Sequence, residues 1–195
     1  DNIVLVDLSK FGSSRVTGML SMFHDCKSLT SIYFGNFDTS LVIDMCYMFY
    51  NCESLTSIDL SSFNTNSIID ISSMFYGCKN IITIDLSSFN TPNLRFLGSI
   101  FYNCEKLQSV NLASFNTTKT EYMDRMFYGC SSLTEINISN FDTSSVRGMH
   151  YMFHGCQLLE SLDITNFDTS SVTDMKCMFE GCNSLEVLNL ANFNT

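Results

Sequence analysis

The nine cysteines are the residues in this sequence most able to do chemistry, through disulfide formation, metal binding or nucleophilic attack. Seven of them recur at one fixed step, a spacing of 26 residues (52 − 26 = 26 for the first two): Cys26, Cys52, Cys78, Cys104, Cys130, Cys156 and Cys182. Stacked members of such a row would lie about 5 Å apart, within the range that a disulfide permits. The row has an odd number of members, however, and each member precedes an apolar segment. We therefore interpret the row as small, buried, free thiols.

The other two cysteines and the histidines give no recognised catalytic pattern. Cys46 and Cys177 lie outside the row and too far apart to pair, and an exposed, reactive thiol on the predicted helical segment is the lesser alternative for them. His150 and His154 are four residues apart, but no Glu follows the first His, as a zinc-protease helix requires. The sequence also lacks a C-x-x-C pair, a Gly-rich phosphate loop and a nucleophile elbow. We predict no enzyme, no metal and no cofactor.

Two rows of acidic and amide side chains follow the same step. The first row is predicted to be a solvated polar face, with a bound cation such as calcium as the alternative. It contains Asp7, Asp59, Asp85, Asn111, Asn137, Asp163 and Asn189. The second row precedes a row of Thr and suits Asx turns at a corner. It contains Asp38, Asn64, Asn90, Asn116, Asp142, Asp168 and Asn194. A Thr row at a corner is not the flat face that ice binding needs.

Aromatic residues supply the candidate binding surface. Tyr50, Tyr76, Tyr102 and Tyr128 form a row that has His24 and His154 at its ends. Such a stripe favours protein or sugar partners, unless the rings only cover one another. The units that contain Pro92 and Lys119 depart most from the repeat, and an exposed Phe96 beside Arg95 would resemble a binding hot spot. The candidate binding residues are Tyr50, Tyr76, Tyr102, Tyr128, Arg95, Phe96 and Tyr122.

The element that positions these residues is an internal repeat, which phenylalanine shows twice over. One row runs from Phe23 to Phe179 and the other from Phe11 to Phe193. Both have the same residue spacing as the cysteine row. We predict one repeat domain over 1–195, as a segment of a longer protein. Its Cys-ending units are 1–26, 27–52, 53–78, 79–104, 105–130, 131–156 and 157–182, followed by a partial unit at 183–195.

Each unit is predicted to hold a strand and a short helix. Leu55, Ile58 and Leu60 alternate with polar residues, which indicates a strand with one buried face. Val172, Met175, Met178 and Phe179 have helical spacing, with Ser171 and Asp174 resembling a capping box and Gly181 a left-handed stop. Neither half can bury its apolar side alone, but stacked units can. We expect an α/β solenoid similar to leucine-rich repeats, with a parallel sheet on one side and short helices on the other.

The repeat resembles a known family. Met152-Phe153-His154-Gly155-Cys156 and Phe167-Asp168-Thr169-Ser170-Ser171-Val172-Thr173-Asp174-Met175 carry the similarity to BspA-like leucine-rich-repeat surface proteins. Phe63 stands where an Asn or Cys is usual in leucine-rich repeats, so the ordinary Asn row is missing. The resemblance implies a secreted or cell-surface protein, often an adhesin, and it implies no catalytic residues.

The composition restricts the classes of partner that this chain can bind. A net charge of −10 with scattered Lys and Arg argues against nucleic acid, and no apolar run is long enough for membrane insertion. Asn116 and Asn137 begin glycosylation motifs, for a secreting eukaryotic host. The leading hypothesis is extracellular or cell-surface recognition of a protein or glycan through an extended surface. The alternatives are a filament or sheath built by end-to-end stacking, because no polar cap is evident, and an intracellular scaffold.

Overall fold

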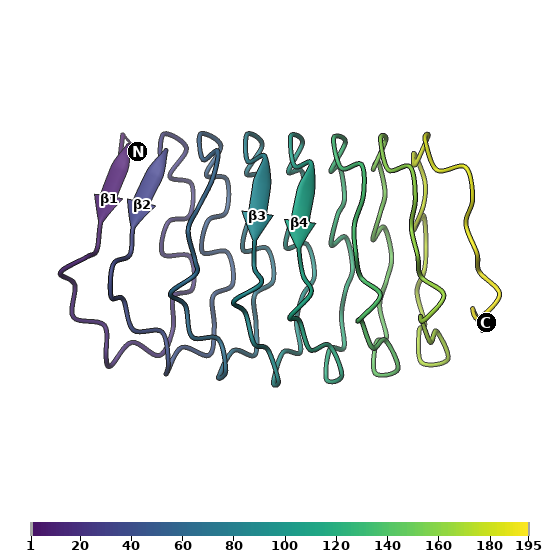
Figure 1. The fold of residues 1–195 in the computed structure, drawn as a ribbon, viewed down its shortest axis with the longest axis horizontal. Coiled ribbons are helices and arrows are strands. Elements are labelled where there is room, and N and C mark those ends of the chain that lie inside the picture. Colours follow the sequence, from purple (N-terminus) through teal and green to yellow (C-terminus); the bar gives the residue numbers. More distant parts are fainter. Residues whose placement is uncertain (1, 195) are drawn as a thin grey trace.

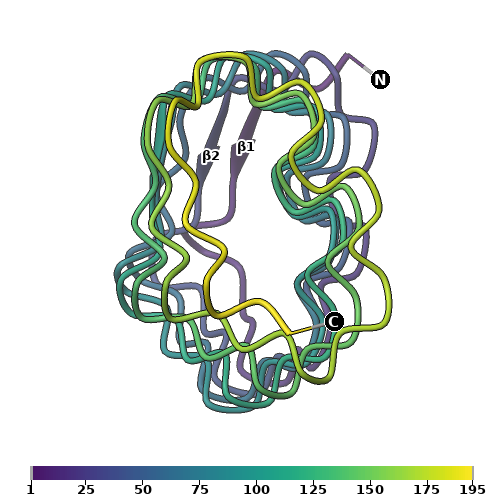
Figure 2. The same ribbon diagram turned by 90° about the vertical axis from the view of Figure 1, so that its right-hand side faces the viewer.

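The computed structural model describes residues 2–194 as a single stack of similar coils (Figure 1). Seen along the stack, the coils superpose into one closed outline around a common interior (Figure 2). Successive units are related by the step of the repeat, because Leu5 pairs with Ser31 and Thr83 pairs with Ser109. The predicted repeat solenoid is therefore confirmed.

One side of the solenoid carries the strands. They are β1 (Leu5–Asp7), β2 (Ser31–Tyr33), β3 (Thr83–Asp85) and β4 (Ser109–Asn111), and they form the two parallel pairs β1–β2 and β3–β4 (Figure 1). The central residue of each strand points inward, as the buried Ile84 and Val110 show, while its neighbours face outward. This matches the predicted alternation, although each strand is only three residues long.

The opposite side of each coil is a run of turns, and the predicted helices are absent from residues 2–194. In the first unit, the amides of Met19, Ser21, Phe23 and Asp25 donate to carbonyls of the next unit. One example is the 2.8 Å bond from Met19 N to Asp44 O. These donors are used between units, so they are not available for helical bonds within one unit.

Residues in the left-handed backbone conformation explain why segments with helical spacing do not form helices. On the turn side, two positions in each Cys-ending unit have positive φ, such as Tyr151 at 58° and Gly155 at 73°, and no α-helix accommodates them. Tight turns with bonds such as Met152 N to Met149 O also bring every third residue to the same side. Val146, Met149 and Met152 are thus fully buried, as the pattern predicted, but on turns. The capping box is wrong too, because Asp174 accepts the amide of Lys176 instead.

The interior consists of columns of identical side chains. Phe rings from successive units stack, with centroids 5.4 Å apart for Phe101 and Phe127. The row cysteines lie beside them, and each thiol from Cys52 to Cys182 donates to the carbonyl of a Phe 29 residues earlier. All nine cysteines are free, which agrees with the prediction for the row. The lesser alternative of an exposed, reactive Cys46 is excluded, because Cys46 is only 7% exposed.

Burial of the thiols has a measurable consequence. Desolvation raises the pKa of the Cys52 thiol to about 12, and it also raises the pKa of Cys104 and Cys156. A raised pKa leaves little of the reactive thiolate at mildly alkaline pH. We expect a thiol reagent to modify the native chain only at the three half-buried cysteines: Cys26, Cys177 and Cys182. Mass spectrometry of the labelled chain checks this, and rapid labelling of Cys104 without denaturant would contradict it.

The corner between the two sides is held by the Thr row. Ser13 and its equivalents from Thr39 to Thr169 are buried, and Thr117 Oγ1 both donates to Asp142 O at 2.9 Å and accepts from Asp142 N at 2.8 Å. Asp142 itself makes the predicted Asx turn, because its Oδ1 accepts Ser144 N at 3.0 Å. These hydroxyls serve the backbone, so they are not presented to a partner or to ice.

Candidate interaction surface on the turn side

The outward side chains of residues 17–25 and their equivalents in later units form one continuous surface, which we call the turn face. Isolated parallel bridges such as Phe96 to Tyr122 run through it from unit to unit. Equivalent residues must therefore lie next to one another, about 4.8 Å apart as in any parallel pairing. The turn face contains all seven candidate binding residues, which fall in three of its rows.

The tyrosine row is a continuous column of stacked rings. The centroids of Tyr50, Tyr76, Tyr102 and Tyr128 are 4.2 to 4.4 Å apart. His24 and His154 extend the column at its two ends, each at 4.5 Å. Desolvation, followed by the neighbouring tyrosines, raises the pKa of the Tyr76 and Tyr128 hydroxyls. The ring faces cover one another, so a partner can contact only the ring edges and hydroxyls.

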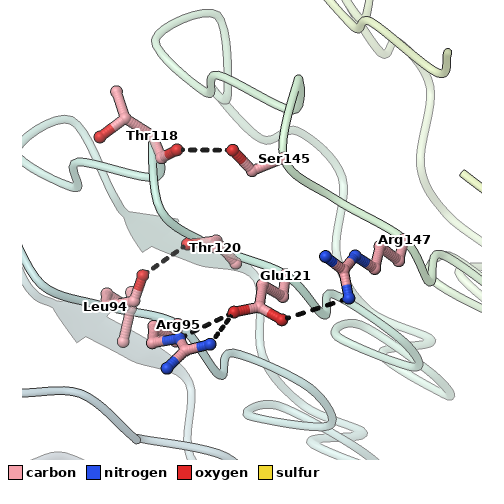
Figure 3. A network of polar contacts seen from close by, with 7 residues as sticks. All are labelled: Leu94, Arg95, Thr118, Thr120, Glu121, Ser145 and Arg147. Carbon is pink, nitrogen blue, oxygen red and sulfur yellow. Dashed lines mark hydrogen bonds and ion pairs between the residues drawn. The ribbon is translucent and has the colours of Figure 1, made fainter. Parts of the chain in front are cut away.

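The second group of candidate residues lies on the same face, in the units that depart from the repeat. Arg95 and Arg147 hold Glu121 between them across three units (Figure 3). Arg95 Nε donates to Glu121 Oε1 at 2.8 Å, and Arg147 Nη1 lies 3.9 Å from Oε2. Both arginines are more than half exposed, whereas Glu121 is 18% exposed. The row thus presents two cationic groups around one acid that is mostly covered.

An aromatic pair adjoins these arginines. Phe96 and Tyr122 stack with centroids 6.0 Å apart, and the Arg95 guanidinium lies 5.7 Å from the Phe96 centroid. Tyr122 is 39% exposed. Phe96 is half-buried, so its predicted exposure is only partial. Lys119 adds a third cation, which donates to Asn93 Oδ1 at 2.8 Å.

The two histidines do not act as a pair. His150 Nδ1 lies 2.6 Å from Asp124 Oδ1, while His154 Nδ1 is 3.5 Å from Glu180 and has no hydrogen-bond partner among the described residues. Gly148 makes room for the Asp124 carboxylate, which a Cβ there would approach to 2.5 Å. Sequence reasoning missed this contact, although Gly148 stands in the row that holds Asp174 in the next unit.

The strand side offers a more ordinary surface. A depression of about 530 Å³ crosses β3, β4 and the following unit, lined by Asp85, Asn111 and Glu135 among others. The first acid row makes Asx turns as well, since Asp85 Oδ1 accepts Ser87 N at 2.9 Å. Hydrogen bonds with the residue two positions later lower the pKa of each of these acids. The pairs are Asp59 with Ser61, Asp85 with Ser87 and Asp163 with Thr165. These bonds give the row a structural role that the sequence did not predict.

Both glycosylation motifs lie on exposed loops. Asn116 Oδ1 accepts the Thr118 hydroxyl at 2.8 Å, and Asn137 Oδ1 accepts the Ser139 hydroxyl at the same distance. The two asparagines lie on the corner and on the strand side, away from the turn face. Modification there would leave the candidate surface free.

The fold and its rows define a repeat-solenoid protein whose side chains are presented in parallel lines. The chain belongs to the family described as "Mycoplasma protein of unknown function, DUF285", whose model matches residues 2–110 and 95–195. A search of curated proteins gives no match. Within residues 2–194, no helix has the length and apolar character needed to cross a membrane.

Two solved structures of repeat proteins are similar to this chain. One is the leucine-rich-repeat protein TpLRR of T. pallidum, at 20% identity and a TM-score of 0.48, over 82% of this chain and 79% of that chain. The other is a leucine-rich-repeat protein from Bacteroides ovatus ATCC 8483, at 24% identity and a TM-score of 0.39. That match covers 87% of this chain and 51% of the Bacteroides chain.

Proposed function

We propose that this chain is a secreted or cell-surface recognition module that binds a protein partner through the turn face. The observation that carries the proposal is the Arg95–Glu121–Arg147 row beside Phe96 and Tyr122. The few residues that dominate binding in protein interfaces are enriched in arginine, tyrosine and tryptophan. The rest of the molecule is strongly acidic, since the whole chain has a net charge of −10. A partner with acidic side chains around an apolar centre fits this surface best.

The surface location rests on the resemblance to BspA-like proteins, and a glycan is the second class of ligand. A binding role without catalysis accounts for polar side chains that run in rows and serve the backbone, as the Thr and Asx rows do. Stacked tyrosines offer only edges to a sugar, which favours a protein ligand over a glycan.

The test is binding of the labelled chain to cultured host cells and to an array of extracellular matrix proteins. The double variant Phe96→Ser/Tyr122→Ser should weaken binding at least about tenfold, because two hot-spot side chains are lost. Tyr33→Ser is the matched control, since Tyr33 is 58% exposed on the strand side. If only the Tyr33 variant loses binding, the partner occupies the other side and the proposal fails.

A further inference from the structure

Asp44, Cys46 and Asp70 form a cluster near the N-terminal end of the turn face. The Cys46 sulfur and one oxygen from each carboxylate all lie within 4.8 Å of one another. We propose that these three side chains bind a thiophilic divalent cation of the zinc type. The cluster adjoins the proposed partner surface, since Asp70 is the bridge partner of Phe96, but the argument for a cation does not depend on the proposed function.

The backbone fixes the two carboxylates side by side. Asp44 and Asp70 are partners in an isolated parallel bridge, so their side chains must stack. Each uses one oxygen to accept the amide two residues on, from Cys46 at 2.8 Å and from Ser72 at 2.7 Å. The second oxygen of each carboxylate remains for a ligand. Nowhere else in this row do two acids follow one another: the other members are Gly18, Phe96, Tyr122, Gly148 and Asp174.

The Cys46 thiol is a second, independent observation that indicates a ligand. Cys46 is 7% exposed, yet it lies outside the cysteine row. Each row thiol from Cys52 to Cys182 donates to a backbone carbonyl, but for Cys46 the described part of the chain offers no such acceptor. Its sulfur lies within 4.8 Å of one oxygen of each carboxylate, while the amide of Tyr47 donates to Ser72 O. A metal ion binds the thiolate and displaces its proton, so a buried thiol without a protein acceptor suits such a site.

Burial makes the cluster unlike the other acids. Asp59 makes the same bond to the residue two positions later, but its carboxylate is exposed on the strand side. Asp44 and Asp70 are instead half-buried side by side. Two adjacent, partly buried carboxylates repel each other unless they share a proton or a cation. A divalent cation would compensate both charges at once.

The donor set selects the class of cation. Calcium and magnesium prefer sites made only of oxygen, whereas a thiolate with carboxylates suits zinc and its heavier relatives. Donor atoms of a tetrahedral zinc lie roughly 3.5 Å apart, so the three atoms would need to approach one another by roughly 1 Å at most. With three protein ligands, the fourth position is left to water or a partner group. The sequence did not suggest this site because Cys46 and Asp70 belong to different units.

The experiment is a titration of the reduced chain with Cd²⁺, followed by the ultraviolet band of the cadmium–thiolate bond. We expect the band to saturate at one equivalent, and Zn²⁺ to abolish it by competition. Cys46→Ser should remove the band, and Asp70→Asn should weaken Cd²⁺ binding by about tenfold or more. Circular dichroism verifies that each variant remains folded.

Two control variants keep the test specific. Cys177→Ser removes the other cysteine outside the row, and Asp174→Asn removes an acid of the same row that makes the same turn, to Lys176 N at 3.0 Å. Both should bind Cd²⁺ as the native chain does. Absence of a band in the native chain, or a band that persists in Cys46→Ser, would overturn the proposal. Cd²⁺ binding without a thiolate band would equally overturn it, because the metal would then be held without the Cys46 sulfur.

Discussion

Replacing Phe127 by Ala should lower the free energy of unfolding by about 3–5 kcal/mol, the usual loss for a buried aromatic ring. Phe127 is fully buried and stacks on Phe101 at 5.4 Å and on Phe153 at 5.6 Å. Its neighbours in the column are held by the backbone ladder between units, so they cannot collapse into the space. Urea denaturation followed by circular dichroism measures the loss.

Phe11→Ala is the matched control for this prediction. Phe11 belongs to a stacked Phe column too, 5.7 Å from Phe37, but it is 53% exposed in the first unit. Its removal leaves no closed cavity, and we expect a loss of about 1 kcal/mol or less. Equal losses for the two variants would mean that the columns do not stabilise the solenoid through burial.

Thr117→Val should have the second largest effect, about 2–4 kcal/mol, although valine has nearly the same shape. The Thr117 hydroxyl satisfies both the amide and the carbonyl of Asp142, and valine leaves both without a partner. An unsatisfied buried polar group costs about 1–3 kcal/mol. The same denaturation experiment applies.

Thr117→Ser separates the hydroxyl from the methyl group. Serine keeps both hydrogen bonds, and Ser13 occupies the equivalent position in the first unit, where it accepts Asp38 N at 2.6 Å. We expect the serine variant to lose about 1 kcal/mol or less, the contribution of one buried methyl. A larger loss for serine than for valine would show that packing, not hydrogen bonding, fixes the corner.

The rows could be predicted from the sequence because stacking forces equivalent residues together. The fixed step of the repeat was sufficient to predict the Phe columns, the buried row cysteines and the tyrosine column. The turns could not be predicted, because Val146, Met149 and Met152 reach the interior equally well from a helix or from successive turns. Positive φ at non-glycine residues such as Tyr151 and Arg125 decides between the two, and their side chains give no sign of it.

Contacts between side chains of different rows also could not be predicted from the sequence. The Arg95–Glu121–Arg147 contacts join equivalent positions and follow from the repeat once the register is known. By contrast, the Asp44, Cys46 and Asp70 cluster joins two rows and two units. Whether neighbouring rows meet depends on how each turn directs its side chains, which the spacing of residues does not specify.

The uniform register has a consequence for how this protein can change in length. Nearly every bond between units joins residues 25 to 29 positions apart, so no unit depends on a distant one. Loss or duplication of one whole unit length, starting at any position, would restore the same neighbours on both sides of the junction. The gene can therefore lengthen or shorten this array by recombination without passing through an unfoldable intermediate. A deletion that is not a multiple of the unit would instead break every column at that point.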